Sequence, residues 1–418
     1  MTLPASGAIS LGQVDTELGL SATAQIGMND SAVRTLFGIS SGQISMSDGY
    51  GKSSVFTTLS FGALTVGAAV NSTSYGAYSS VTTLTSTLAV MAYRDGATGG
   101  ACLQLINISG TTCTPSTILN VTGSGNVRWC SIKALSSTKA VFTWSNLNVN
   151  SGQEEGCVVT ISGSTLTAGA TVVIDPFCCS YGTQARMTGT QTMVTYQGGP
   201  GPYFWLTSHV LDCDLSANTI TVGPRYVLNS ANMGFNSMDT ISPTQAVIAY
   251  QNISTGGSME ASVISTSGTA ISVGALNYVE PAVKSYQIVT TMTPSKVILI
   301  NRVAGSGIMD AHIMNVSGTT LSVDAYLNLA SYSCMYHAAS GLSSTQIVAA
   351  TRNGATANME ARIISANGNT LTTTAAQTTA YSMHANAYSF MTTLAANKTL
   401  LVYASTASNM EMCVITAS

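Results

Sequence analysis

The feature that most constrains the fold of this chain is an internal repeat. Seven short runs of similar character, each rich in Val, Ile, Ala and Thr, recur along the sequence. They begin at Thr87, Thr138, Thr190, Thr244, Ser295, Thr345 and Asn397, at steps of 51, 52, 54, 51, 50 and 52 residues. A nearly constant period of this length is typical of repeat architectures, in which each unit buries its apolar faces against its neighbours.

Each repeat contains four stretches with β character, and the second repeat shows them most clearly. Its strands are predicted at residues 126–135, 138–144, 156–163 and 165–174. A tight turn at Gly163 separates the last two strands, which is typical of a hairpin. Helical spacing of apolar residues is absent from residue 54 onward, so the repeats predict an all-β protein.

The second strand of each repeat is apolar on both of its faces. In the second repeat, Ala140, Phe142 and Trp144 alternate with Val141 and Thr143. A strand that is buried on both sides must lie in a sheet stacked between neighbouring sheets. Four-stranded units of about 50 residues that are stacked face to face and closed radially form a β-propeller. We therefore expect a seven-bladed β-propeller with four-stranded blades.

The two ends of the repeat region predict how this ring closes. The last repeat stops after its third strand, at residues 409–418, and lacks a fourth strand. Residues 54–70 precede the first repeat and resemble a fourth strand such as the one that begins at Thr269. We expect residues 54–70 to complete the last blade, as a clasp between the N-terminal and C-terminal ends that leaves no open sheet edge. The predicted domains are residues 1–53 and a propeller at 54–418.

The composition excludes several classes of partner. Charged residues make up only 7% of the chain, against roughly 25% in an ordinary soluble domain. The net charge of −3 provides no basic surface for nucleic acid. No segment is as long and apolar as a membrane span, and the first residues lack the pattern of a secretory signal. We expect a protein made in a cytoplasm that binds neither nucleic acid nor membrane.

The nine cysteines and four histidines show no ligand pattern. An odd number of cysteines with irregular spacing does not describe a disulfide framework. No C-x-x-C pair and no histidine spacing of a zinc site is present. We expect buried thiols, and we assign neither a metal nor a cofactor.

Charged residues are so scarce that the repeated ones stand out. An acidic residue stands at the start of the third strand of five repeats, and an arginine ends the second strand of three repeats. Arg302 and Asp310 flank one hairpin and Arg352 and Glu360 flank another, so each pair is expected to face each other across its hairpin. The pairs are interpreted as ion pairs that fasten the hairpins. A ring of ligand-contacting charges is the alternative.

An aromatic residue ends the second strand of five repeats. Packing between blades is one interpretation of this series, and a surface on which sugars stack is the other. Together with the repeated arginines, the series supplies the candidate ligand-binding residues. These are Tyr93, Arg94, Trp144, Tyr196, Tyr250, Arg302 and Arg352.

No short catalytic motif is found in the sequence. Nucleophile elbows, Walker loops, H-E-x-x-H and the S-x-D-x-G-x-T-W boxes of sialidase-like propellers are missing. The repeated acidic residues occur one per repeat, so they do not predict the paired carboxylates of glycoside hydrolysis. We therefore expect that the chain is not an enzyme.

The sequence pattern of residues 1–53 differs from that of the repeats, because it predicts short helices in place of strands. Ser10 and Gln13 form a capping-box pattern that predicts a short helix, and Asn29 with Asp30 is expected to cap a second one. A segment of this length buries little apolar surface by itself. We therefore expect it to dock onto a partner. Its candidate docking residues are Leu11, Val14, Leu18, Val33, Leu36, Phe37, Met46 and Tyr50.

The same segment resembles part of a known class of proteins. Within residues 3–53 the phrases ISLGQVDTELG, AVRTLFG and ISMSDGYGKS follow one another. This order resembles the N-terminal segment of tail-associated and other virion proteins of tailed bacteriophages. In those proteins a bulky aromatic residue often stands where this chain has Gly49. The remainder resembles repeat propellers in general, which is a likeness of fold.

The resemblance implies a virion structural protein that is assembled in the host cytoplasm and held to the particle through contacts of residues 1–53 with other virion proteins. We expect a tail fibre or tail-tip component whose propeller contacts a host-surface glycan or protein. A head-decoration or purely architectural protein is one alternative, and a carbohydrate-active enzyme of the tail is another. Virion appendages are symmetric assemblies, so an oligomer is expected within the particle.

Overall fold

The computed structural model of this chain divides into two compact units, Met1–Ser60 and Phe61–Ser418. The residues that it describes are 9–11, 13–14, 27–28, 30, 33–34, 42–49, 62–149, 152–177, 179–199, 204–280, 283–384, 389–406 and 409–418. Within these ranges, none of the helices has the length and apolar character that crossing a membrane requires. The two units are described separately below.

In the first unit, a small apolar cluster and one 3-10 helix, η1 (Met46–Gly49), are described. The Ser10 amide donates to Gln13 Oε1 at 2.8 Å, and the Gln13 amide donates to Ser10 Oγ at 3.2 Å, as the capping box predicts. The two predicted helices are not shown, because most of their residues lie outside the described ones.

The second unit consists almost entirely of β-strands, arranged as repeat units with an inner, a second, a third and an outer strand. The inner strands are β2 (Val70–Thr85), β6 (Val127–Ala134), β11 (Cys179–Arg186), β16 (Met233–Ser242), β21 (Lys284–Thr293), β25 (Cys334–Gly341) and β30 (Phe390–Ala395). The second strands are β3 (Leu88–Asp95), β7 (Lys139–Asn146), β12 (Gln191–Gly198), β17 (Gln245–Asn252), β22 (Lys296–Val303), β26 (Gln346–Asn353) and β31 (Lys398–Ala404).

The third strands follow the second strands as hairpins, and most outer strands are short or broken in two. The third strands are β4 (Ala101–Ser109), β8 (Gln153–Ser162), β13 (Leu206–Asp214), β18 (Ser258–Ser267), β23 (Met309–Ser317), β27 (Asn358–Asn367) and β32 (Asn409–Ala417). The outer strands are β1 (Leu64–Val66), β5 (Thr112–Asn120), β9 (Thr165–Ala168), β10 (Val172–Asp175), β14 (Thr219–Val222), β15 (Tyr226–Asn229), β19 (Ala270–Val273), β20 (Asn277–Glu280), β24 (Thr320–Ala330), β28 (Thr370–Thr373) and β29 (Gln377–Ser382). A second 3-10 helix, η2 (Ile253–Thr255), follows β17.

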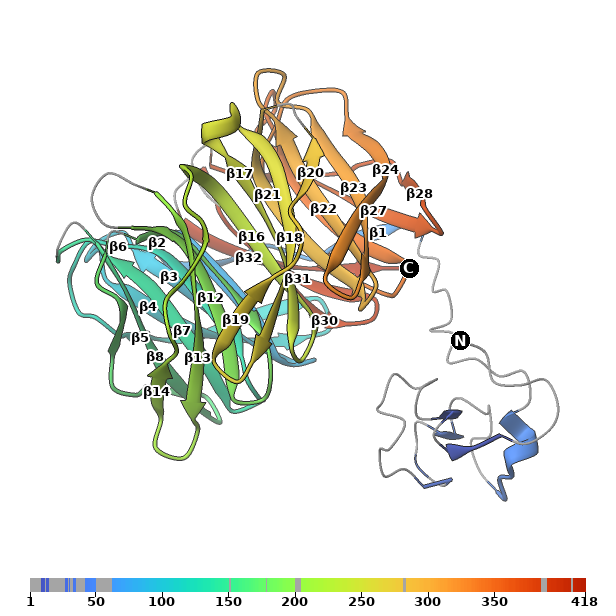
Figure 1. Ribbon diagram of the computed structural model, residues 1–418, viewed down its shortest axis with the longest axis horizontal. Helices are drawn as coiled ribbons and strands as arrows, with labels where there is room; N and C mark the ends of the chain where they lie inside the picture. The colour runs from blue at the N-terminus through green and yellow to red at the C-terminus, as the bar shows by residue number, and fades with distance from the viewer. Residues whose placement is uncertain are drawn as a thin grey trace. The chain divides into compact units, whose positions relative to one another are not determined.

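The inner strands form a closed ring. They contact one another in the order β2, β6, β11, β16, β21, β25 and β30, and β30 returns to β2. Figure 1 shows the twisted sheets arranged around a common centre. The second unit is therefore an all-β propeller built from four-stranded units, as the repeats predict.

The number of sheets differs from the prediction. The propeller has six sheets, five with four or five strands and one with eight, so the prediction of seven separate blades is corrected to six. The physical reason is β2, which is long enough to belong to two repeat units. Its first part pairs with β32 of the last unit, and its second part pairs with β3 of the first. The first and last repeat units therefore share one eight-stranded sheet.

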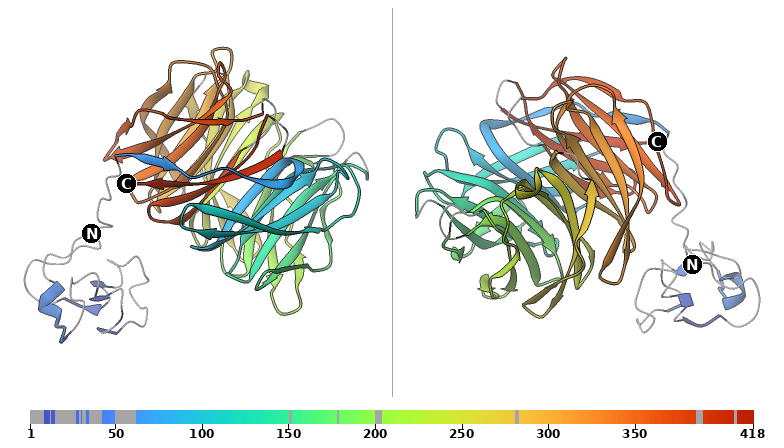
Figure 2. Two further views of the ribbon diagram at one scale, coloured as in Figure 1. Left: turned by 180° about the vertical axis from the view of Figure 1, so that it is seen from behind. Right: turned by 45° about the horizontal axis from the view of Figure 1, so that its top comes forward.

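The ends of the chain meet in this sheet. Leu64 of β1 lies opposite Ala417 of β32, and Val70 of β2 lies opposite Met412. Figure 2 shows the blue N-terminal strands beside the red C-terminal strand. The strand that closes the last unit is thus found at Leu64–Val66, inside the predicted segment 54–70, and in the first part of β2, which starts at the end of that segment and continues past it. Residues 54–61 of that segment lie outside the described residues.

Apolar clusters between neighbouring repeat units hold the ring together. One cluster joins Leu103 of the first unit to Phe142 of the second, and another joins Ile106 of the first unit to Val402 of the last. These four side chains are fully buried. Each buried aliphatic or phenylalanine side chain contributes roughly 1.5–3 kcal/mol. The apolar faces of the second strands are therefore the main source of stability, as their pattern predicts.

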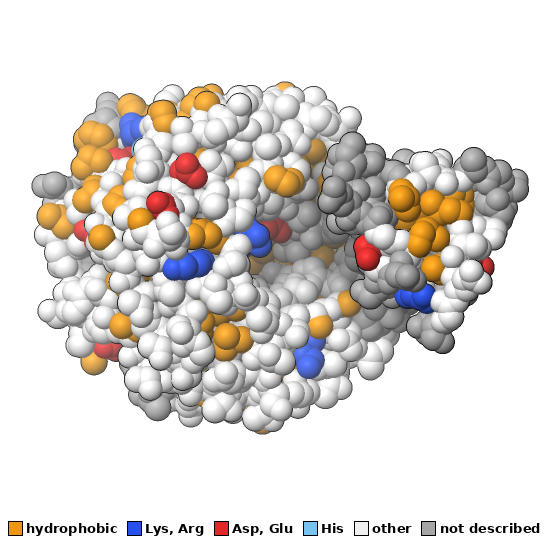
Figure 3. Space-filling view, turned by 90° about the horizontal axis from the view of Figure 1, so that it is seen from below, with side chains coloured by type: hydrophobic (Ala, Val, Ile, Leu, Met, Phe, Trp, Pro, Cys, Tyr) orange, Lys and Arg blue, Asp and Glu red, His pale blue; other side chains and the backbone are white. Residues whose placement is uncertain are grey.

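Threonine hydroxyl groups form hydrogen bonds between neighbouring inner strands of the ring. Thr83 Oγ1 donates to the carbonyl of Thr393 at 2.6 Å, and Thr240 Oγ1 donates to the carbonyl of Arg186 at 2.6 Å. These contacts use neutral groups, in keeping with the low charge of the chain. Figure 3 shows only scattered charged side chains on one face of the surface.

Candidate functional site

The aromatic residues predicted to bind a ligand are buried inside the blades. The exposed fraction is 0% for Tyr93, Trp144 and Tyr196 and 3% for Tyr250. Trp144 Nε1 donates to Glu155 Oε2 at 2.8 Å. None of these four rings is available to a ligand on the surface, so the sugar-stacking interpretation is wrong for them and the packing interpretation is correct.

The predicted ion pairs across the hairpins are also wrong, because the strand register differs by one residue. Arg302 lies opposite Met309, and Asp310 lies opposite Asn301. A shift of one residue places two side chains on opposite faces of a sheet. In the same way Arg352 lies opposite Met359. Asp310 instead accepts from Lys284 Nζ at 2.6 Å.

The docking residues predicted in the first unit fall into three groups. Val14 and Val33 are fully buried in the cluster of that unit, so they do not present a docking surface. Leu11 is 40% exposed and Met46 is partly buried. The remaining four lie outside the described residues: Leu18, Leu36, Phe37 and Tyr50.

A different set of aromatic residues lines the inner strands, and we call it the collar. It consists of Tyr78, Trp129, Tyr181, Phe235 and Tyr286. Each ring contacts the next, with centroid separations of 5.4, 5.2, 4.7 and 4.3 Å in chain order. All five are partly exposed. Because they stand on consecutive inner strands, they form a continuous aromatic row on the inside of the ring.

The collar rings are held by an unusual backbone. Each lies in a β-bulge where the pairing of its inner strand with the second strand shifts register. Tyr78, Trp129, Tyr181 and Tyr286 have φ of 52, 48, 54 and 53°. Bulky residues rarely adopt this left-handed conformation, which costs roughly 1–2 kcal/mol at each position. The same strained geometry thus recurs in four repeat units.

The sequence contains a signal for the collar that the pattern of alternating apolar residues does not reveal. The five collar residues are 51, 52, 54 and 51 positions apart, which is the period of the repeat itself. Tyr336 and Tyr388 continue the spacing at 50 and 52 positions, although their side chains lie outside those described. An aromatic residue therefore occurs once per repeat at this position.

A guanidinium group lies against the collar. The Arg128 guanidinium carbon is 5.9 Å from the centre of the Tyr78 ring and 5.7 Å from that of Trp129. Both distances fit cation–π contacts. Arg128 Nε and Trp129 Nε1 are buried, and the described residues supply no hydrogen-bond acceptor for either. The partly exposed rings suit a molecule that has an apolar face, and the two donors suit a hydrogen-bond acceptor that reaches them when the bulge opens.

A buried acid, Glu154, stands near the collar in the second repeat unit. Glu154 is fully buried, and burial raises its pKa from the usual 4.5 to about 8. Ser145 Oγ donates to Glu154 Oε2 at 2.8 Å, whereas no hydrogen bond to Oε1 is found among the described residues. A Cβ added to Gly182, next to the collar residue Tyr181, would lie 3.1 Å from Oε1. The other repeat units carry apolar residues at this position: Ala101, Leu206, Met259, Met309, Met359 and Met410.

A second group of ionisable residues lies between the fourth and fifth repeat units. Lys284 Nζ is 2.9 Å from Glu280 Oε2 and 2.6 Å from Asp310 Oδ2, and His312 Nε2 is 3.5 Å from Glu280 Oε2. Glu280, Asp310 and His312 lie close enough to hold a metal ion together. However, the Lys284 ammonium already supplies the positive charge. The sequence reading missed this group because no short motif links its members.

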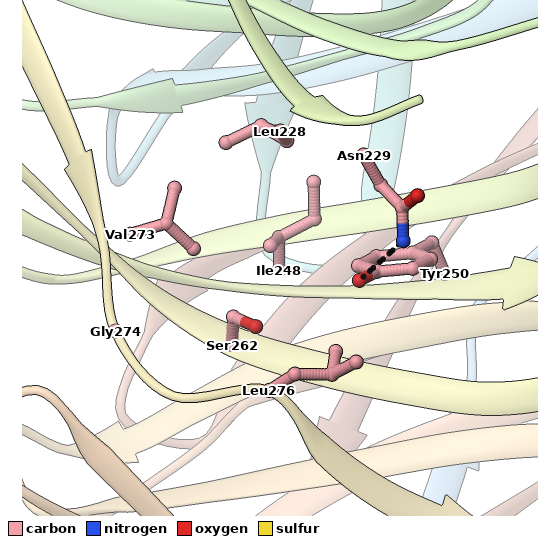
Figure 4. A pocket seen from close by; sticks show the side chains of 8 residues that line it. All are labelled: Leu228, Asn229, Ile248, Tyr250, Ser262, Val273, Gly274 and Leu276. Carbon is pink, nitrogen blue, oxygen red and sulfur yellow. Dashed lines mark hydrogen bonds between the residues drawn. The ribbon is translucent and has the colours of Figure 1, made fainter. Parts of the chain in front are cut away.

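A pocket between the third and fourth repeat units is too small to be a strong candidate. Figure 4 shows its side chains, with a hydrogen bond from Asn229 Nδ2 to Tyr250 Oη. Its volume is about 150 Å³. Ligand pockets usually measure about 300–1,000 Å³. The lining is mainly apolar and comes from Leu228, Asn229, Ile248, Tyr250, Ser262, Val273, Gly274 and Leu276.

Comparisons with known proteins concern the fold. No protein-family model and no curated protein matches this sequence. A solved structure of a protein from Lactobacillus plantarum is similar with a TM-score of 0.50 and 11% identity, over 73% of this chain and 85% of that one. A Hadza microbial sialidase has a TM-score of 0.43 and 11% identity, over 78% and 75%. An oligogalacturonate lyase from Vibrio parahaemolyticus has a TM-score of 0.47 and 9% identity, over 85% and 98%.

The expectation that the chain is not an enzyme is corrected by these comparisons. Two of the similar structures are enzymes, namely the sialidase and the lyase. At such low identity the likeness shows the fold alone. The absence of short motifs also does not exclude catalysis, because residues that lie far apart in sequence can form one catalytic site in the folded chain.

Proposed function

We propose that the propeller binds carbohydrate, and that the collar is the surface on which the sugar rings pack. The observation that carries this proposal is the continuous row of partly exposed aromatic rings at the inside of the ring. Sugars in their ring form present apolar C–H faces, and these pack well on flat aromatic rings. A row of such rings suits a chain of sugar units better than a single small molecule.

The strained backbone of the collar supports a binding role over a purely structural one. An apolar side chain can fill a core from a relaxed strand, as Phe142 and Leu103 do elsewhere in the ring. The collar instead keeps four aromatic residues in the left-handed region. Strain of this kind persists where the surrounding structure enforces it, and it clusters at binding and active sites.

The biological setting of this binding follows from the resemblance of residues 3–53 to virion proteins. In this proposal the first unit attaches the protein to a phage particle, and the propeller contacts a host-surface glycan. Antibody labelling of assembled particles tests the setting: label on the tail exterior is expected. Label on the head exterior would favour the decoration role, and absence from particles would contradict both.

A carbohydrate-active enzyme is the second candidate, and Glu154 is the observation that favours it. A carboxylic acid whose pKa is about 8 is protonated at neutral pH and is suited to donate a proton to a leaving group. Glu154 is fully buried, so this role requires the bulge at Tyr181 and Gly182 to move. Release of reducing sugar by the purified protein, and its loss in Glu154→Gln, are the expected results. Polysaccharide that remains intact would exclude this candidate.

The binding proposal is tested with the full-length protein and a panel of host-surface polysaccharides. Trp129→Ala removes the ring that contacts both Tyr78 and Tyr181. Affinity is expected to fall about two- to tenfold, since stacking of one ring contributes roughly 0.5–1.5 kcal/mol beyond its buried area. Tyr278→Ala is the matched control, because Tyr278 is 64% exposed and lies outside the collar. Equal affinities of the two variants would contradict the proposal.

A further inference from the structure

The sector of the collar around Arg128 contains hydrogen-bond donors that have no acceptor. Arg128 Nε and Trp129 Nε1 are both buried and unpartnered among the described residues. Leaving a buried donor without an acceptor costs roughly 1–3 kcal/mol, and more for a charged group. Such a cost in a folded protein calls for a missing partner.

Arg94 Nε and Arg362 Nε are also buried without an acceptor among the described residues, but three other arginines of the propeller are paired. Arg302 Nε donates to the carbonyl of Cys334 at 2.7 Å, and Arg352 Nε donates to the carbonyl of Met383 at 2.8 Å. Arg225 pairs with Asp175, with Nε 2.9 Å from Oδ2. Among the residues that the structure describes, neither a carbonyl nor a carboxylate accepts from Arg128 Nε.

The positive charge of Arg128 also has no negative partner in the described part of the chain. Across the sheet, Arg128 lies opposite Ser145, and Ser145 lies opposite Glu154. Glu154 is uncharged at neutral pH, because burial raises its pKa to about 8. A second guanidinium lies near the collar, since Arg94 stands opposite Ala77, the residue before Tyr78, and its Nε is also buried without an acceptor.

We propose that the ligand is an acidic saccharide, whose anionic group accepts hydrogen bonds from Arg128 and Trp129 while its sugar rings pack on the collar. Because Arg128 Nε and Trp129 Nε1 are buried, these hydrogen bonds require the bulge between Arg128 and Ser131 to open. This inference rests on the proposed carbohydrate-binding function and names the class of sugar. A planar guanidinium binds a carboxylate or a sulfate through two parallel hydrogen bonds. The cation–π contacts of Arg128 with Tyr78 and Trp129 hold that group beside the stacking surface. One end of the collar is thereby suited to an anion and the rest to neutral C–H faces.

The test measures the affinity of the full-length protein for three oligosaccharides of similar length by calorimetry. The probes are a galacturonate oligomer, a sulfated galactose oligomer and a neutral galactose oligomer. The first two distinguish carboxylate from sulfate, and the third supplies the reference. At least one acidic oligomer is expected to bind about tenfold or more tightly than the neutral one, and its affinity is expected to fall as salt is raised.

Arg128→Gln supplies the second part of the test, with Arg186→Gln as its matched control. Arg186 is exposed on β11, so its substitution removes the same charge away from the collar. Arg128→Gln is expected to lower the affinity for the acidic oligomer about tenfold or more, with little change for the neutral one. Arg128→Lys keeps the charge without the planar group and is expected to lie between Arg128→Gln and the unmodified protein.

The outcomes separate this inference from the function on which it rests. If all three oligomers bind with equal affinity, the choice of an acidic sugar is overturned while carbohydrate binding stands. If Arg128→Gln weakens the neutral oligomer as much as the acidic one, Arg128 shapes the collar and the inference is also overturned. If no saccharide of the wider panel binds, the proposed function itself fails. Thermal unfolding of each variant shows whether it is folded.

Discussion

Arg302 reaches from one repeat unit into the next, where its Nε donates to the carbonyl oxygen of Cys334 at 2.7 Å. Cys334 is the first residue of β25, the inner strand of the following unit. The contact recurs between Arg352 and the carbonyl of Met383 at 2.8 Å. These arginines therefore connect neighbouring units, whereas the sequence pattern suggested that they fasten their own hairpins.

The first prediction concerns this connection. Arg302→Met keeps much of the side-chain volume but removes the donor, so the carbonyl of Cys334 loses a charged partner. The free energy of unfolding is expected to fall by about 1–3 kcal/mol in urea titrations. In a double-mutant cycle, Arg302→Met and Asp310→Asn should be nearly additive, because Arg302 lies opposite Met309.

The matched comparison uses the partner that Asp310 has in the structure. Lys284 and Asp310 are each 1% exposed in their side chains, and their charged atoms are 2.6 Å apart. Lys284→Met with Asp310→Asn is therefore expected to show a coupling of about 1 kcal/mol or more. Strong coupling of Asp310 with Arg302, and weak coupling with Lys284, would restore the interpretation based on the sequence.

A second prediction follows from the backbone of the collar. Tyr181 has φ of 54°, a conformation that glycine adopts without strain and alanine does not. Tyr181→Gly and Tyr181→Ala both remove the ring, but the glycine variant is expected to be more stable by about 1 kcal/mol. In an ordinary strand the order is reversed. Melting temperatures of the two variants give the sign directly, and a more stable alanine variant would contradict the described bulge.

The repeat period and the alternation of apolar residues predicted most of the fold. The second strands are buried on both faces, as their composition indicates, and the hairpin from the second to the third strand occurs in every unit. The number of sheets was predicted less well, because β2 belongs to two repeat units and joins their sheets. No pattern within a single repeat reveals that a strand will continue from one unit into another.

The functional residues were predicted less well than the fold, for two physical reasons. Strand pairing alternates faces at every residue, so an uncertainty of one residue in register was enough to assign Arg302 to the wrong partner. The collar lies in bulges, where the simple alternation stops, and this is why Trp129 and Tyr181 were not recognised. In the sequence, Glu154 differs from the apolar residues that the other repeat units have at the same position, but no motif marks it as functional.

The third prediction concerns closure of the ring. Removing residues 1–60 leaves β1 and the whole of β2 in place, so the shortened protein is expected to unfold cooperatively near the temperature of the full chain. Removing residues 1–75 also deletes the segments that pair with β32 and exposes its edge. That protein is expected to aggregate. Equal solubility and equal melting temperatures of the two shortened proteins would contradict this closure.

The last prediction concerns the acid beneath the collar. Because burial raises the pKa of Glu154 from 4.5 to about 8, the folded chain holds this proton more tightly than the unfolded chain does. The resulting contribution to stability is fully present below pH 4.5 and is lost as the pH rises to about 8. The loss is about 1.4 kcal/mol per pH unit within that range.

Glu154→Met isolates this effect, since methionine occupies the same position in the units that contain Met259, Met309, Met359 and Met410. The variant is expected to gain stability relative to the unmodified protein as the pH is raised from about 5 to about 8. His337, whose pKa burial lowers to about 4, has the opposite dependence, but it is present in both proteins and cancels in the difference. Urea titrations at several pH values measure that difference. A difference that stays constant with pH would show that Glu154 is ionised in the folded protein, and the uncharged acid required beside Arg128 would then be absent.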